Sequence, residues 1–180
     1  MDKDRFRLTI ACLSEGGAEL AAELSNLAEV QAFSLAMNRY KIDPITDSWV
    51  ASQLARVIQS GRFDLIHAHA SKAGFLARVA AVGTGVPVIY SPHYFAFQDG
   101  AGQVKAALYA GVEWFAARYL TARIITVSNH EREAARQYKV GRADQFVTIH
   151  SGIELAAFDI VVDREAQRAA LGVPTTAPLV

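Results

Sequence analysis

The sequence of 180 residues has little cysteine, no net charge and no long apolar run, and each shortage excludes a class of protein. A single cysteine, Cys12, cannot form an internal disulfide framework or a cysteine-based zinc site. Lysine and arginine number 18, as do aspartate and glutamate, so the bulk positive charge of a nucleic-acid binder is missing. The longest uncharged stretch, residues 79–98, contains glycine, proline and histidine and makes a poor membrane-spanning helix.

The residues that are present predict a folded chain. Apolar residues make up 52% of the sequence and charged residues 20%, which supplies a packed core and is unlike a disordered segment. Residues 1–5 are mostly charged and no clean apolar run follows them, so a secretory leader is not expected. We therefore expect a cytoplasmic protein of one domain, or of one domain and part of another.

Short apolar runs alternate with longer helical segments along the chain. Several short runs are apolar without alternation, as in parallel strands that are buried on both faces. This order predicts a Rossmann-like α/β fold, an open and mainly parallel sheet with helices on both faces. The predicted strands are 7–13, 30–36, 64–69, 87–91, 123–127 and 145–150. The predicted helices are 17–28, 46–60, 72–82, 103–120, 128–138 and 163–171.

Helix boundaries carry recognisable residues. Asp43 before Pro44, Ser71 and Ser128 are predicted N-caps, and Ser128 with Glu131 fits a capping box. At the other end of the sequence, the final two residues (179–180) resemble the first residues of another strand.

The net charge of zero conceals a basic segment in the middle of the sequence. Residues 100–142 carry seven basic and three acidic side chains, together with Tyr109, Trp114, Phe115 and Tyr119. A basic, aromatic helix can lie on a membrane surface. We favour the simpler interpretation that the aromatic residues face the core and the arginines are ordinary surface residues.

All five histidines follow or end a predicted strand. These residues are His67, His69, His93, His130 and His150. The carboxyl ends of parallel strands share one edge of a sheet, where open α/β folds place their ligand crevice. The sequence therefore predicts a histidine-lined site at this edge.

The residues at this edge are compatible with several functional and structural roles. His67 and His69 point to the same face of a strand, as a metal pair or as imidazoles that are hydrogen-bonded within the fold. His93 lies in a loop with aromatic neighbours, where it can contact a hydroxylated substrate or pack on those neighbours. Ser71 and Lys72 open a helix directly after a strand, an arrangement that suits an anion, although Lys72 can equally be a solvated helix residue.

Four segments resemble family 4 (GT-B fold) glycosyltransferases of the branch that builds capsular and exopolysaccharides. Residues 67–78 (HAHASKAGFLAR) resemble its H-A-H-x-S-K-A-G-x-L-x-R, and residues 87–97 (PVIYSPHYFAF) resemble its P-x-V-Y-T-P-H-G-F-A-F. Residues 127–133 resemble V-S-x-x-E-R-E, and residues 149–158 resemble the I-P-N-G-V-D-x-x-x-F that leads into the second domain. Four motifs in the family's order make this a specific match.

The resemblance implies the acceptor-side, N-terminal half of a retaining GT-B glycosyltransferase. Such enzymes transfer a sugar from a nucleotide-sugar to a hydroxyl group, commonly on a lipid-linked saccharide in cell-surface polysaccharide synthesis, with no metal and no other cofactor. A C-terminal domain or subunit holds the nucleotide, so this chain alone is expected to be inactive. The resemblance also implies peripheral contact with the inner face of a membrane, and it gives no role to nucleic acid.

The same match assigns the site residues. It makes His93 the catalytic histidine that faces the transferred sugar, and it places Ser71 and Lys72 on the acceptor side of the cleft. The further substrate-binding residues are His69, Gly74, Tyr94 and Ser128, and the donor-side linker residues are Ser151 and Gly152.

This sequence also departs from the family's pattern. Tyr94 stands where the family has glycine, and His150 and Ser151 replace a Pro-Asn pair. The strand at 7–13 aligns best with the family's second strand, so the first, central strand is missing. Alternatively, residues 15–19 (EGGAE) contain the first strand's glycine-rich loop, with the second strand deleted.

The expected domains follow from this alignment, and two other functions stay open. Residues 1–158 form the Rossmann-like domain, and residues 159–180 form a linker and the start of an absent donor domain. One alternative is a stand-alone saccharide- or lipid-binding module, or a subunit that pairs with a donor-binding protein. A less favoured alternative is a metal-dependent hydrolase that uses His67 and His69.

Overall fold

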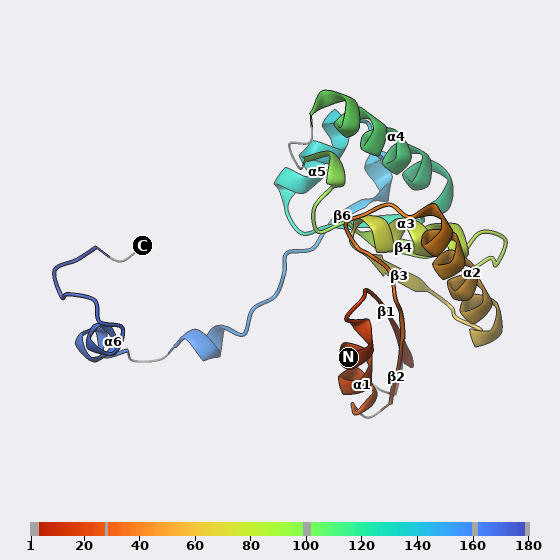
Figure 1. The fold of residues 1–180 in the computed structure, drawn as a ribbon. Coiled ribbons are helices and arrows are strands. Elements are labelled where there is room, and N and C mark those ends of the chain that lie inside the picture. Colours follow the sequence, from red (N-terminus) through yellow and green to blue (C-terminus); the bar gives the residue numbers. More distant parts are fainter. Residues whose placement is uncertain (1–3, 28, 99–101, 160–161, 179–180) are drawn as a thin grey trace. The chain divides into compact units, whose positions relative to one another are not determined.

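A computed structural model describes residues 4–27, 29–98, 102–159 and 162–178 (Figure 1). The chain divides into two compact units, residues 1–150 and residues 151–180. The first unit holds the described strands and five α-helices, and the second holds one short α-helix. The predicted domain boundary after residue 158 stays a prediction.

The strands of the first unit form two parallel sheets. β1 (Leu8–Leu13) pairs with β2 (Val30–Leu35). The second sheet has four strands in chain order, β3 (Ile66–His69), β4 (Val88–Ser91), β5 (Arg123–Thr126) and β6 (Phe146–Thr148). The six predicted strands and their parallel pairing are confirmed. In the described part of the chain no ladder joins the two sheets, and the missing first strand stays a prediction.

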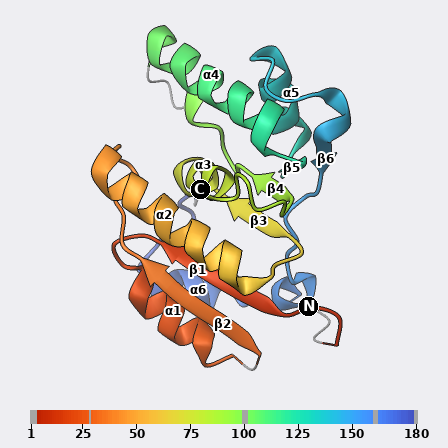
Figure 2. The ribbon, with the colours of Figure 1, turned by 90° about the vertical axis from the view of Figure 1, so that its right-hand side faces the viewer.

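Helices connect successive strands, as the alternating pattern predicts. α1 contacts β1 and β2, α2 packs against α3, and α3 packs against α4 (Figure 2). The five predicted helices of this unit are confirmed as α1 (Gly17–Ser25), α2 (Pro44–Gly61), α3 (Ser71–Ala80), α4 (Gln103–Leu120) and α5 (Asn129–Gln137).

Two of the predicted N-caps form. The Asp43 carboxylate accepts hydrogen bonds from the backbone N–H of Ile45 and of Thr46 at the start of α2. The Ser128 hydroxyl accepts a hydrogen bond from the backbone N–H of Glu131, 3.1 Å away, at the start of α5. Each cap satisfies helix N–H groups that have no partner within the helix.

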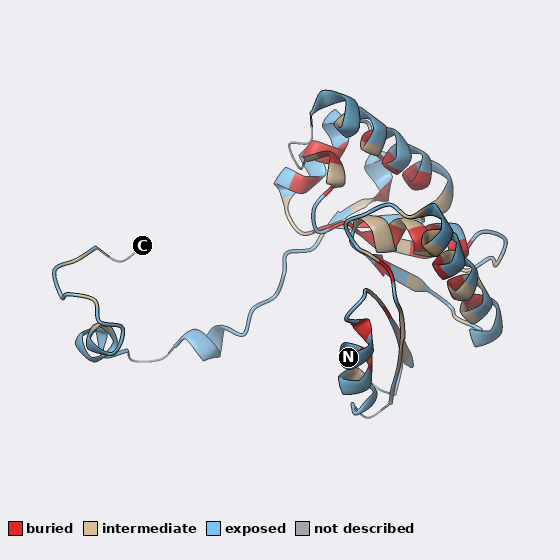
Figure 3. Cartoon of the chain, viewed as in Figure 1, coloured by how far each residue is buried: buried red, intermediate tan, exposed pale blue. Residues whose placement is uncertain are grey.

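The core of the first unit lies between the sheets and their helices (Figure 3). On α2 the buried residues are Val50, Leu54 and Ile58, which recur every four residues along one face of the helix. Tyr90 on β4 and Ile124 on β5 are fully buried. Burial of these side chains stabilises the frame that carries the edge of the four-stranded sheet.

A buried polar cluster joins α3, β4 and α4. The Arg78 guanidinium donates two hydrogen bonds to the Glu113 carboxylate, at 3.0 and 3.1 Å, and lies 3.9 Å from the centre of the Tyr90 ring. The Tyr90 hydroxyl donates to the same carboxylate at 3.1 Å. Burial, and next the charge of Glu113, raise the pKa of Tyr90. Gly74 lies against this ring, and a Cβ there would collide with it.

Three of the four aromatic residues of α4 do not face the core, so our favoured interpretation is wrong for them, whereas Tyr109 is half-buried and packs against the core. Trp114, Phe115 and Tyr119 are 46%, 49% and 64% exposed. The buried residues of α4 are Ala110, Glu113, Ala116 and Ala117. Because α4 is apolar around most of its circumference, its sequence pattern does not show which face packs inward.

The second unit is small and exposed. It contains the 3₁₀ helix η3 (Leu155–Phe158) and α6 (Arg164–Ala170), and Asp163 caps α6. The helix predicted at 163–171 is thus confirmed. None of the unit's described residues is buried, and the strand start predicted at residues 179–180 lies outside the described residues.

Candidate functional site

The carboxyl ends of β3, β4, β5 and β6 bring the histidines to one edge of the four-stranded sheet. His67 and His69 lie in β3, and His93 lies two residues after β4. His130 lies in the first turn of α5, which follows β5, and His150 lies two residues after β6. Because the strands are parallel, the predicted histidine-lined edge is present.

Three of these histidines are in contact. His69 Nδ1 and His93 Nε2 are 2.9 Å apart, and their rings stack with centroids separated by 5.2 Å. The His67 and His69 rings are 4.0 Å apart between centroids. His67 Nε2 is also 2.8 Å from Ser91 Oγ, since β3 and β4 are neighbours in the sheet.

This contact limits the charge that the cluster carries. Burial, followed by the charges of His67 and His93, lowers the pKa of His69 to about 4. Burial and the charge of His93 lower the pKa of His67 as well. His67 and His69 are therefore neutral near pH 7. In the bond between His69 and His93, one nitrogen donates the proton and the other accepts it.

The loop after β4 presents His93 at the edge. His93 has a φ of 60°, a left-handed backbone conformation that non-glycine residues rarely adopt. The loop then turns inward into the 3₁₀ helix η1 (Ala96–Gln98), where the buried rings of Phe95 and Phe97 stack on one another. The exposed Tyr94 donates its hydroxyl proton to the Gln98 carbonyl at 2.7 Å. The aromatic residues anchor the loop and leave the His93 imidazole exposed.

Glu131 is a neighbour of this cluster that our sequence analysis considered as a helix cap and as part of the V-S-x-x-E-R-E segment, but not as a site residue. Its side chain is buried, and Oε2 accepts a hydrogen bond from the backbone N–H of Val127 at 2.7 Å. Oε1 is also buried, and it has no hydrogen-bond partner among the described residues. Burial raises the pKa of Glu131, while the Val127 amide and the charge of His93 oppose that rise. The capping-box pattern was the sequence signal that pointed to this residue.

Ser71 and Lys72 make contacts within the protein. The Ser71 hydroxyl donates to the Tyr94 carbonyl at 3.2 Å, and α3 begins at Ser71 itself. Ser71 is therefore not the predicted N-cap, because its hydroxyl is used across the loop. The Lys72 ammonium binds Asp47 at 2.6 Å and the backbone carbonyls of Asn38 and Lys41.

The other predicted site residues lie in different surroundings. Ser128 caps α5, and Gly74 is buried against Tyr90, so both have clear structural roles. Ser151 and Gly152 are exposed residues of the second unit. The binding roles assigned to these residues, and to Ser71 and Lys72, stay predictions.

The arrangement suits hydrogen bonding. Within residues 4–27, 29–98, 102–159 and 162–178, no three histidine, cysteine or acidic side chains gather as metal ligands do. The edge offers an exposed imidazole, His93, whose partner His69 is neutral. Such a group can exchange hydrogen bonds with the hydroxyl groups of a polar ligand.

Comparison with known proteins identifies relatives of the chain. The family described as "Glycosyl transferase 4-like domain" matches residues 2–152. An Escherichia coli protein, UDP-Gal:alpha-D-GlcNAc-diphosphoundecaprenol alpha-1,3-galactosyltransferase, is 27% identical over 91% of this chain and 41% of its own length. The putative glycosyltransferase EpsD of Bacillus subtilis is 32% identical over 77% of this chain and 36% of its own length. The chain thus spans less than half of each relative.

Solved structures share the fold. HepE from Anabaena, crystallised with UDP and glucose, superposes with a TM-score of 0.64 and 18% identity, over 93% of this chain and 50% of HepE. A glycosyltransferase from Rickettsia africae superposes with a TM-score of 0.64 and 19% identity, over 94% of this chain and 43% of the other. These matches support the α/β fold that the sequence predicts.

Proposed function

Because the chain belongs to the glycosyl transferase 4-like family, we propose that it is the acceptor-binding domain of a retaining glycosyltransferase. The enzyme would transfer a sugar from a nucleotide-sugar to a lipid-linked saccharide in cell-surface polysaccharide synthesis. The observation that carries the proposal is the histidine cluster at the carboxyl-end edge, with His93 exposed and paired to a neutral His69. The E. coli relative, named for a saccharide linked to diphosphoundecaprenol, supports this acceptor class.

In this proposal His93 contacts the sugar that is transferred. His69 Nδ1 contacts His93 Nε2, so the Nδ1 side of the His93 ring is left for a sugar hydroxyl. The contact fixes the orientation of the ring, and the buried Glu131 adds negative charge nearby when it is ionised. Oriented groups of this kind stabilise a transition state because they need no reorganisation during the reaction.

The proposal divides the work between two domains. This chain would hold the acceptor, and a C-terminal domain or subunit would hold the nucleotide and stabilise the leaving diphosphate. The nucleotide-sugar is a substrate, and we propose no metal and no other cofactor. The isolated chain should therefore bind the acceptor without catalysing transfer.

Acceptor binding tests the first half of the proposal. Addition of a short-chain polyprenyl-diphosphate-linked N-acetylglucosamine to the 180-residue chain should shift NMR amide signals around residues 69–72, 93–94 and 128–131. Signals at the opposite ends of the strands should not move. Shifts confined to that opposite edge, or sugar transfer from a nucleotide-sugar by the isolated chain, would overturn the proposal.

The role of His93 needs the assembled enzyme. When the chain is joined by its donor-binding domain or subunit, His93→Ala should lower kcat about 100-fold or more, the effect of losing one transition-state hydrogen-bond donor. Arg123→Ala, at the opposite end of β5, is the control and should change kcat little. Equal losses in both variants would remove His93 from its proposed role.

A further inference from the structure

The segment that joins β2 to α2 contains a tight turn at residues 38–41, which we call the Asn38 turn. Asn38 Oδ1 accepts hydrogen bonds from the backbone N–H of Tyr40 and of Lys41, at 3.0 and 2.8 Å. Asparagine side chains commonly stabilise turns in this way. Asn38 Nδ2 also donates to Glu15 Oε1, 3.2 Å away, in the loop after β1. The side chain of Asn38 thus organises the turn and connects it to a neighbouring loop.

The side chain of Lys72 reaches this turn from α3. Its ammonium donates to the backbone carbonyls of Asn38 and Lys41, at 2.7 and 2.6 Å, and it forms an ion pair with Asp47 of α2 at 2.6 Å. An ammonium carries three N–H groups, so these three oxygens match its donors in number. The side chains of Lys72 and Asp47 are only 17% and 13% exposed, so dissolved salt screens the ion pair weakly.

These contacts lie beside the histidine edge. Lys72 follows His69, the last residue of β3, by three positions. The preceding residue, Ser71, donates a hydrogen bond to the carbonyl of Tyr94 in the loop after β4. The first turn of α3 therefore holds two loops at this edge, the Asn38 turn through Lys72 and the loop after β4 through Ser71.

The Asn38 turn presents large side chains to solvent. Tyr40 is 86% exposed, and the Arg39 guanidinium lies 5.1 Å from the centre of its ring. Neither side chain belongs to the core, so their position depends on the backbone of the turn. Groups that are held in place before a ligand arrives lose less conformational freedom when they bind it.

We infer that Lys72 is a positioning residue: its ammonium holds the Asn38 turn beside the histidine edge, where the turn forms one wall of the acceptor site. Only the second half of this inference rests on the proposed function. The resemblance implies instead that Lys72 contacts the acceptor itself. The two roles can be separated by experiment, because an anion that took the N–H groups of Lys72 would have to displace the carbonyls of Asn38 and Lys41.

Hydrogen–deuterium exchange of the 180-residue chain, followed by NMR, tests the first half without any ligand. Lys72→Met removes the ammonium and should speed the exchange of the Tyr40 and Lys41 amides at least about tenfold, the effect of losing hydrogen bonds to a charged group. Asp47→Asn keeps a side-chain oxygen but removes its charge, and should have a smaller effect in the same direction. The Glu131 amide, which is capped on α5, should exchange at the wild-type rate in both variants.

Lys105→Met is the matched control, because it applies the same substitution to an exposed lysine of α4, and it should leave the exchange rates of Tyr40 and Lys41 unchanged. Circular dichroism and the Tm check that each variant is folded, and Asp47→Asn decides the outcome if Lys72→Met does not fold. Wild-type exchange rates in the deciding variant would overturn the inference. It is also overturned if inorganic pyrophosphate speeds exchange of the same amides in the wild type, which would make Lys72 an anion ligand.

Acceptor binding tests the second half. With the polyprenyl-diphosphate-linked N-acetylglucosamine, Lys72→Met should raise the Kd about tenfold, and Asp47→Asn should raise it by less. If Lys72 contacts the diphosphate directly, removal of the competing Asp47 charge should lower the Kd instead, and that result would overturn the inference. An unchanged Kd in Lys72→Met would do the same. If the wild-type chain does not bind this acceptor, the proposed function fails, whereas the exchange rates still decide whether Lys72 holds the turn.

Discussion

The histidine edge and the outer face of α4 differ in whether their side chains have partners within the protein. At the edge, polar groups find partners within the protein: His69 with His93, His67 with Ser91, and Lys72 with Asp47. On α4, large apolar groups are left without cover. The difference teaches that the edge is organised before any ligand arrives, whereas the apolar side chains on the outer face of α4 remain exposed in this chain.

Both regions depend on one buried support. Tyr90 lies in β4, the strand that leads to Ser91 and His93, and it donates a hydrogen bond to Glu113 of α4. Arg78 of α3 completes the cluster from the side that carries Ser71 and Lys72. Changes to this cluster should therefore affect both regions together.

The largest expected effect comes from breaking this support. Glu113→Ala leaves Arg78, only 1% exposed, without its carboxylate partner. Removal of one member of a buried ion pair costs about 3–5 kcal/mol. Urea unfolding should show this loss in the free energy of unfolding. Glu133→Ala breaks an exposed pair with Arg136 and should change that free energy little; equal losses would contradict the role of the cluster.

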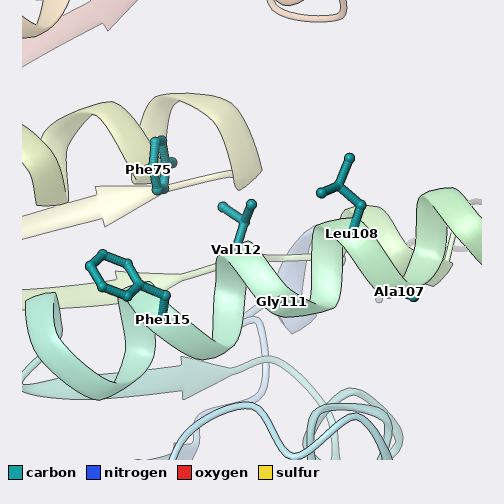
Figure 4. Close-up of a pocket in the computed structure, with 6 residues that line it drawn as sticks. All are labelled: Phe75, Ala107, Leu108, Gly111, Val112 and Phe115. Carbon is teal, nitrogen blue, oxygen red and sulfur yellow. The ribbon is translucent and has the colours of Figure 1, made fainter.

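Substitutions of two glycines, Gly74 and Gly111, compare a tightly packed position with an open one. Gly74→Ala would press a methyl group into the buried Tyr90 ring, and overpacking of this kind costs about 1–3 kcal/mol. Gly111→Ala places the methyl group in the open apolar groove between Phe75 and α4 (Figure 4), where alanine's helix propensity should stabilise α4 by up to about 1 kcal/mol. Opposite changes in the urea midpoint are expected, and a loss at both positions would show that the groove is closed.

A further effect concerns the histidine edge alone. The pKa of His69 is about 4 in the folded chain, below the ordinary value of 6.5. Between these pH values the unfolded chain binds more protons, so the free energy of unfolding should fall as the pH drops from 6.5 towards 4. His67 acts in the same direction. His69→Gln should flatten this slope in urea titrations at several pH values.

Local sequence predicts local structure well in this chain. The strands and helices follow from runs of apolar residues, and the caps at Asp43 and Ser128 follow from side chains that satisfy nearby N–H groups. The histidine edge was predictable because parallel strands end at the same side of a sheet. The contact between His69 and His93 was not, since it depends on the register of β3 against β4 and on the backbone of His93.

Long-range packing determines the structural features that the sequence pattern does not predict. The sequence by itself determined the alternating elements, the parallel order and the position of the histidines, because these depend on neighbours along the chain. Only the tertiary structure decided that Lys72 is held by Asp47, that the carboxylate of Glu131 is buried near His93, and that α4 turns its alanines inward. Each depends on which surface of a neighbouring element is available for packing, and residue order along a single helix does not specify that surface.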